Sequence, residues 1–200
     1  MRYSLFIIVS FFIGTAHAAD FKNLHVEYRD GIYTMSADIF INAPPAEVRY
    51  VITDYDHLDR ISGAVKKSQF LARPAPDTAV FFMQLEMCFG VFCQDIRQVL
   101  RMDESQPHTL TAIALPEYSN VTSAKTLWQM RPCNGGTCLH WESTMKPKFW
   151  LPPLIGPAMV EATLRDFAHY TAQGIEKLAR EWAVIHGTAQ NPTSHTVRQP

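Results

Sequence analysis

The sequence lacks the short motifs that mark common catalytic and nucleotide-binding sites. It contains no HExxH, no GxSxG, no P-loop and no glycine-rich dinucleotide fingerprint. Its 8 histidines are scattered, and no pair has a spacing typical of metal ligands. We therefore expect no catalytic residues of a recognisable type, no bound metal and no cofactor.

The chain also lacks any long block of charge of one sign. Its 18 basic and 19 acidic residues give a formal net charge of −1. Nucleic-acid binding needs a basic patch or stripe, so we expect no nucleic-acid partner. The chain also has no polybasic segment that could bind a membrane surface, so we expect at most transient membrane contact. No pattern indicates an oligomeric state.

Residues 1–20, MRYSLFIIVSFFIGTAHAAD, have the pattern of a secretory signal peptide. One early arginine precedes an apolar core, and Ala16 and Ala18 form a small-x-small cleavage site. We expect removal of residues 1–18 and a periplasmic or secreted location; an uncleaved membrane anchor is the alternative. Residues 19–186 are predicted to form one domain, and the polar residues 187–200 a disordered tail.

Four cysteines form two similar local pairs, CFGVFC at 88–93 and CNGGTC at 133–138. An exported chain meets oxidising conditions, so we expect the disulfides Cys88–Cys93 and Cys133–Cys138. The second pair is favoured further by the NGG turn signal between its cysteines, which would place them on facing strands. Cross-pairing and a four-thiolate zinc site are the alternatives.

Turn residues and side-chain alternation predict mostly β-structure. Two strands should flank an Asp30-Gly31 turn within 24–43, and PPAEVRYVITDY predicts a helix because prolines are tolerated at a helix start. A second short helix is expected before Gly63. Further strands are expected at 65–72, 78–87, 92–102, 109–115, 121–131 and 139–146.

The longest helical signal lies at 156–187, where apolar residues recur every three or four positions and charges occupy the other face. Together these elements predict an α+β fold. A curved antiparallel sheet would wrap around the long C-terminal helix, with two short helices after the first strands. Such an arrangement readily leaves space between sheet and helix.

The segment KFWLPPLIGP at 148–157 is apolar yet rich in proline, which excludes a regular helix or central strand. It immediately precedes the long helix, at the mouth of the predicted space. We therefore expect Trp150 and Leu154 to close over a cavity. A loop that only plugs the edge of the core is the alternative.

The stretch ADIFINAPPAEVRYVITDYDHLDRISGAVKKSQFL, residues 37–71, combines a strand, an alanine-proline helix start, two helices and the next strand. It resembles the opening of the START-like, Bet v 1-like helix-grip superfamily (SRPBCC; polyketide cyclase/dehydrase and lipid transport), and within it the coenzyme Q-binding START-type branch. The resemblance spans residues 33–183. It implies a hydrophobic cavity between sheet and C-terminal helix; members bind lipids, sterols, quinones, polyketides or plant hormones, and some are cyclases or hydrolases. The signal peptide and the paired cysteines depart from the usual pattern, so a ubiquinone role is not carried over.

Alternation along the strands and spacing on the helix predict which side chains face this cavity. Each could equally belong to an ordinary core. The predicted ligand-binding residues are Phe81, Met83, Leu85, Ile96, Leu100, Trp128, Met130, Trp141, Met145, Trp150, Leu154, Leu164 and Phe167.

Glu86, Asp95 and Arg97 flank the first cysteine pair and form a candidate polar group. Facing a cavity, a carboxylate and an arginine could orient a polar head group or assist proton transfer. We favour the alternative of a cross-strand ion pair on the solvent side.

These features predict an exported protein that binds a hydrophobic small molecule, such as a lipid or isoprenoid, for transport or sequestration. An enzyme resembling polyketide cyclases and dehydratases is a less favoured alternative. An interaction module whose core is filled by its own side chains is another.

Overall fold

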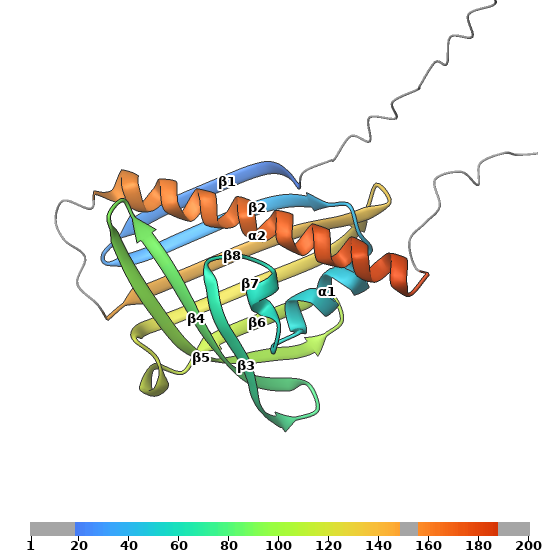
Figure 1. Cartoon of the computed structure of the whole chain (residues 1–200), viewed down its shortest axis with the longest axis horizontal. Helices are drawn as coiled ribbons and strands as arrows, with labels where there is room; N and C mark the ends of the chain where they lie inside the picture. The colour runs from blue at the N-terminus through green and yellow to red at the C-terminus, as the bar shows by residue number, and fades with distance from the viewer. Residues whose placement is uncertain (1–18, 149–155, 188–200) are drawn as a thin grey trace, which may run out of the picture.

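An eight-stranded antiparallel sheet and one long helix make up the fold (Figure 1). The computed structural model describes residues 19–148 and 156–187. Neighbours in the sheet follow the order β1-β2-β8-β7-β6-β5-β4-β3. The strands are β1 (Asp20–Arg29), β2 (Ile32–Ile41), β3 (Val65–Ala75), β4 (Thr78–Phe89), β5 (Phe92–Gln106), β6 (Thr109–Ala114), β7 (Val121–Cys133) and β8 (Gly136–Pro147).

The long helix α2 (Pro157–Ile185) lies across one face of the sheet, where it contacts β1, β2, β4 and the shorter helix α1 (Pro45–Thr53) (Figure 1). This confirms the predicted α+β helix-grip fold. The predicted second short helix is a single 3₁₀ turn, η1 (Leu58–Arg60), and a further turn, η2 (Pro116–Tyr118), precedes β7. Across residues 19–148 and 156–187, no helix has the length and apolar character needed to cross a membrane.

Two-residue turns connect the strands of the β1–β2 hairpin and of the β7–β8 hairpin. Asp30 and Gly31 have φ values of 53° and 80°, and Asn134 and Gly135 have values of 46° and 78°. Asn, Asp and Gly adopt this left-handed region most readily, and such turns match the twist of the strands they join. The DG and NG signals therefore mark hairpins, as the sequence predicts.

Several strands run beyond their predicted ranges. The fifth continues to Gln106 instead of residue 102, and the eighth begins at Gly136 instead of residue 139. The prediction ended strands where polar residues or cysteines interrupt the apolar pattern, but a tight turn keeps the backbone paired up to the turn itself. Cys88 and Cys93 consequently face each other directly on β4 and β5.

Candidate functional site

Between the sheet and α2 lies a space of about 130 Å³, here called the inner cavity. Its walls come from the middle of the sheet, from α2, and from the chain between α1 and β3. Most of its lining is aliphatic or aromatic. The lining residues are Ile52, Leu58, Ile61, Val65, Phe81, Met83, Leu85, Gln98, Leu100, Met102, Ala112, Thr126, Trp128, Trp141, Ser143, Phe167, Thr171 and Ile175.

Strand alternation determines which side chains form the sheet side of the cavity wall. Thr126 pairs with Ser143, and Trp128 pairs with Trp141, across β7 and β8. Because successive side chains point to opposite faces, these four positions share the face that meets α2. The Trp141 ring packs edge-on against Phe167 of the helix, with ring centroids 6.0 Å apart.

The inner cavity also contains polar groups. Gln98 is 4% exposed, and the hydroxyls of Thr126 and Ser143 lie 3.1 Å apart in a hydrogen bond. Trp141 Nε1 and Thr171 Oγ1 are buried and have no hydrogen-bond partner among the described residues. All of these groups are neutral, and no charged side chain is found among the lining residues that the structure describes.

Tyr55 fixes the Phe81 side of the wall. The two rings stack with centroids 4.5 Å apart, and the Tyr55 hydroxyl donates a hydrogen bond of 2.7 Å to the Glu104 carboxylate. Burial, and then the bond to Glu104, raise the pKa of Tyr55 well above its ordinary value. The hydroxyl therefore stays protonated at neutral pH and keeps this bond.

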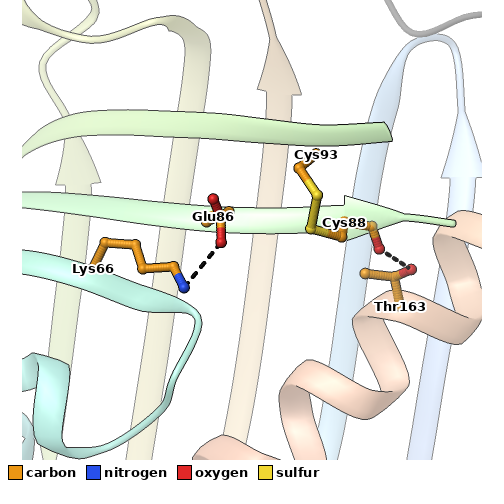
Figure 2. The surroundings of a disulfide bond; sticks show 5 residues. All are labelled: Lys66, Glu86, Cys88, Cys93 and Thr163. Atoms are coloured by element: carbon orange, nitrogen blue, oxygen red, sulfur yellow. Dashed lines mark hydrogen bonds and ion pairs between the residues drawn. A yellow bond between two sulfur atoms is a disulfide. The ribbon is translucent and has the colours of Figure 1, made fainter. Parts of the chain in front are cut away.

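A second space of about 540 Å³, here called the outer pocket, shares Ile61 and Phe167 with the inner cavity. It is bounded by residues 61–64, the end of β4 and the first half of α2. Thr163 of α2 donates a hydrogen bond of 3.2 Å to the Cys88 carbonyl at this boundary (Figure 2). The remaining lining residues are Ser62, Gly63, Ala64, Glu86, Met87, Asp166 and Tyr170.

Both predicted disulfides are present. Cys88–Cys93 joins β4 to β5 beside the outer pocket (Figure 2). Cys133–Cys138 joins β7 to β8. No cysteine is left free, so cross-pairing and the four-thiolate zinc site are both wrong. Nor do the described residues include a cluster of three or more His, Cys, Asp or Glu side chains arranged to hold a metal ion.

The structure brings many of the predicted ligand-binding residues to the inner cavity. Met130 and Met145 share the inward face but lie beyond the two ends of the cavity, opposite Leu139 and Ala124. Ile96 is completely buried in the core, and Leu164 packs against the core without lining the cavity. Trp150 and Leu154 lie outside the described residues. The predicted ligand-binding residues that do line the inner cavity are Phe81, Met83, Leu85, Leu100, Trp128, Trp141 and Phe167.

The candidate polar group is not gathered in the inner cavity. Asp95 and Arg97 are exposed, and their positions alternate with the buried Ile96 and Gln98 on β5. Glu86 lines the outer pocket and pairs with Lys66 at 2.9 Å across β3 and β4, as Figure 2 shows. The structure therefore places these groups away from the inner cavity, in keeping with the solvent-side alternative.

The wall contains residues that the sequence prediction missed. Gln98, Thr126 and Ser143 are polar, so a search for apolar faces passes over them. Their positions still carry a signal, since each alternates in step with large apolar residues on its own strand. Ile52, Leu58 and Ile61 were missed for another reason: they reach the cavity only through the packing of α1 and η1 against the sheet.

Residues 33–182 match the family model described as polyketide cyclase/dehydrase and lipid transport. The chain belongs to this family. No curated protein matches it.

Several solved structures are similar to this family member. The Zhui aromatase/cyclase from Streptomyces sp. R1128 has a TM-score of 0.61 at 15% identity, over 76% of this chain and 96% of that one. A START superfamily protein from Mycobacterium smegmatis has a TM-score of 0.60 at 15% identity, over 74% and 98%. A STAR-related lipid transfer protein from Xanthomonas axonopodis has a TM-score of 0.58 at 15% identity, over 83% and 98%. At this identity the likeness establishes the fold alone.

Proposed function

We propose that this protein binds a hydrophobic small molecule, such as a lipid or isoprenoid, between the sheet and α2, and transports or sequesters it. The observation that carries the proposal is the inner cavity, with aromatic and aliphatic walls on both sheet and helix. Transfer of apolar ligand surface from water into such a space supplies affinity. The remaining free space argues against an interaction module with a filled core.

Catalysis on a polyketide is less well supported. Among the described residues, the lining of the inner cavity offers no carboxylate, histidine or lysine for proton transfer. Asp95 and Arg97 are exposed on the other side of β5, and Glu86 is paired with Lys66. The cyclases among the similar structures therefore contribute a shared fold, and carriage is the function that the lining favours.

We further propose that binding takes place after export, in the periplasm or outside the cell. The two disulfides support an oxidising compartment. The leader-like residues 1–18 and the tail after 187 lie outside the described residues, and their removal and disorder remain predictions.

Carriage can be tested by native mass spectrometry on protein purified from its own compartment without detergent, followed by organic extraction. A stoichiometric hydrophobic adduct is expected. Ala112, which lines the cavity and is 1% exposed, offers a blocking variant: Ala112→Met should fill the space and abolish the adduct.

Thr111→Met is the matched control, because Thr111 precedes Ala112 on β6 and points to the opposite face. It should keep the adduct. An apo mass that stays unchanged on incubation with lipid extracts would refute carriage.

A further inference from the structure

Two polar groups on the wall of the inner cavity lack hydrogen-bond partners within the described part of the chain. Trp141 is 4% exposed, and its Nε1–H is buried without an acceptor. Thr171 also lines the cavity, and its Oγ1 is likewise buried without a hydrogen-bond partner. Buried polar groups in native proteins are normally hydrogen-bonded, because an unmade bond costs the full desolvation of the group. These two groups therefore point to a missing partner inside the cavity.

Thr171 differs in this respect from another helical threonine of the same chain. Thr53 of α1 donates its hydroxyl to the Arg49 carbonyl, four residues earlier, at 3.0 Å. Back-bonding of this kind satisfies the hydroxyl of a helical threonine within its own helix. The Thr171 hydroxyl makes no such bond among the described residues, so it is available to a ligand.

The two groups meet the cavity from opposite sides. Trp141 is on β8, and its ring packs against Phe167 of α2. Thr171 follows Phe167 by one turn of the same helix, so both share the inward face of α2. A ligand held between β8 and α2 would therefore meet one unpartnered group on the sheet side and one on the helix side.

The neutral lining and the volume of the inner cavity further restrict the chemistry of the ligand. An indole N–H is a donor only, so its partner must be an acceptor. The lining residues that the structure describes provide no counter-charge for a carboxylate, phosphate or ammonium, and an unpaired buried charge is strongly unfavourable. The volume of about 130 Å³ is close to the roughly 150 Å³ of an apolar cavity that holds benzene.

We propose that the inner cavity receives an uncharged, ring-sized end of the ligand that carries a carbonyl or hydroxyl oxygen. This oxygen accepts a hydrogen bond from Trp141 Nε1 and lies beside Thr171 Oγ1. The rest of the ligand extends past Ile61 and Phe167 into the outer pocket, where Glu86, Asp166 and Tyr170 surround it. The inference rests on the proposed function, because it describes one end of the same ligand.

Three probes of similar planar shape test this proposal: acetophenone, α-methylstyrene and benzoate. Calorimetric titration at pH 7 should show acetophenone binding about tenfold tighter than α-methylstyrene, as one buried hydrogen bond would give, and no measurable binding of benzoate. In ¹⁵N–¹H NMR spectra, acetophenone should shift the Trp141 Nε1–H resonance downfield.

Trp141→Phe should remove the preference for acetophenone while α-methylstyrene still binds. Trp182→Phe is the matched control, because Trp182 stacks on Tyr50 and does not line the inner cavity, and it should keep the preference. Should Trp141→Phe fail to fold, Thr171→Val, which keeps the shape of the side chain, should reduce the same preference severalfold.

The outcomes separate this proposal from the broader function. Equal affinity for acetophenone and α-methylstyrene, an unmoved Trp141 resonance, or tight benzoate binding would overturn the inference and leave carriage intact. Binding of none of the probes, together with an adduct-free native mass spectrum, would overturn both.

Discussion

Gly174 of α2 lies so close to Ile61 that a Cβ at position 174 would stand 1.7 Å from the Ile61 carbonyl oxygen. No real Cβ contact is that short, so only glycine fits at this helix position. Ile61 lines both the inner cavity and the outer pocket. The close approach of backbone to backbone therefore fixes the position of Ile61 where the two spaces adjoin.

We predict that Gly174→Ala lowers the free energy of unfolding by about 1–3 kcal/mol, because the neighbour that must move is backbone. The gain in helix propensity, about 1 kcal/mol, is too small to offset this displacement. Denaturant unfolding measures the change. Gly63→Ala is the control, since a Cβ at Gly63 meets nothing within 4 Å; equal effects of the two changes would contradict the steric explanation.

A second prediction concerns the buried Glu176, which is 5% exposed and accepts a hydrogen bond of 3.0 Å from the Asn42 backbone N–H. Glu176→Ala should destabilise the fold by about 1–3 kcal/mol, because the amide loses its acceptor. Glu176→Gln keeps an acceptor oxygen and should cost less. Thermal unfolding of both variants tests the order, with the exposed Glu181→Ala as a neutral control. Gln as damaging as Ala would show that the hydrogen bond is not what matters.

The third prediction is a pH dependence of stability from His140 and Asp38. Their side chains approach to 2.7 Å, and His140 also lies 3.0 Å from Glu142. The bond to Asp38, then that to Glu142, raises the pKa of His140 above its ordinary 6.5. The bond from His140, then that from Asn23, lowers the pKa of Asp38 below its ordinary 3.8.

The signs follow from the two directions. The contribution of His140 is complete below its unfolded pKa and is lost as the pH rises through its raised folded pKa. That of Asp38 is complete above its unfolded pKa and is lost as the pH falls through its lowered folded pKa. Both are present between pH values of about 4 and 6.5.

Unfolding measured from pH 3 to pH 9 should therefore show a maximum in that interval that flattens in His140→Gln. The expected loss stays below about 1 kcal/mol, because solvent screens this partly exposed group. His57→Gln is a comparison at the pair of His57 and Asp54, where the histidine is more exposed than His140, and it should change the profile less. An identical profile for His140→Gln and the parent protein would contradict the assignment.

The two disulfides should differ in effect. Replacing either pair by alanines is expected to lower stability by up to about 2 kcal/mol, as closing such short loops gives in the chain-entropy model. Only the loss of Cys88–Cys93 should speed ligand exchange, because Cys88 lines the outer pocket and its carbonyl holds Thr163 of α2. Stopped-flow displacement of a bound ligand compares the two double variants. Similar exchange rates would remove this disulfide from any role in binding.

Sequence alone predicted the order of elements because local signals mark them. Asp30-Gly31 and the NGG stretch indicate hairpins, and the apolar period at 156–187 indicates the long helix. Strand ends were predicted less well, since backbone pairing continues through polar positions such as those between Met102 and Gln106. The local hydrophobic pattern reflects which side chains are buried, whereas the extent of backbone pairing between two strands is set by the turn that joins them.

The wall of the cavity was only partly predictable for a related reason. Alternation assigns Met130 and Trp128 to the same face of β7, but nothing in the pattern says how far along the strand the cavity extends. The contribution of Ile61 depends on the contact with Gly174, which joins residues more than a hundred positions apart. Such information exists only in the folded chain.

The place of β2 in the sheet has a consequence for how the chain folds. Strands β3 to β8 pair with their neighbours in sequence, whereas β2 pairs with β8, from Ile41 with Thr137 to Tyr33 with Met145. Closing the long loop between β2 and β8 costs more chain entropy than forming a hairpin, and it slows folding. We expect the meander from β3 to β8 to gain protection from hydrogen exchange first. The hairpin of β1 and β2, although synthesised before the strands that follow it, would then be the last to pair with the rest of the sheet.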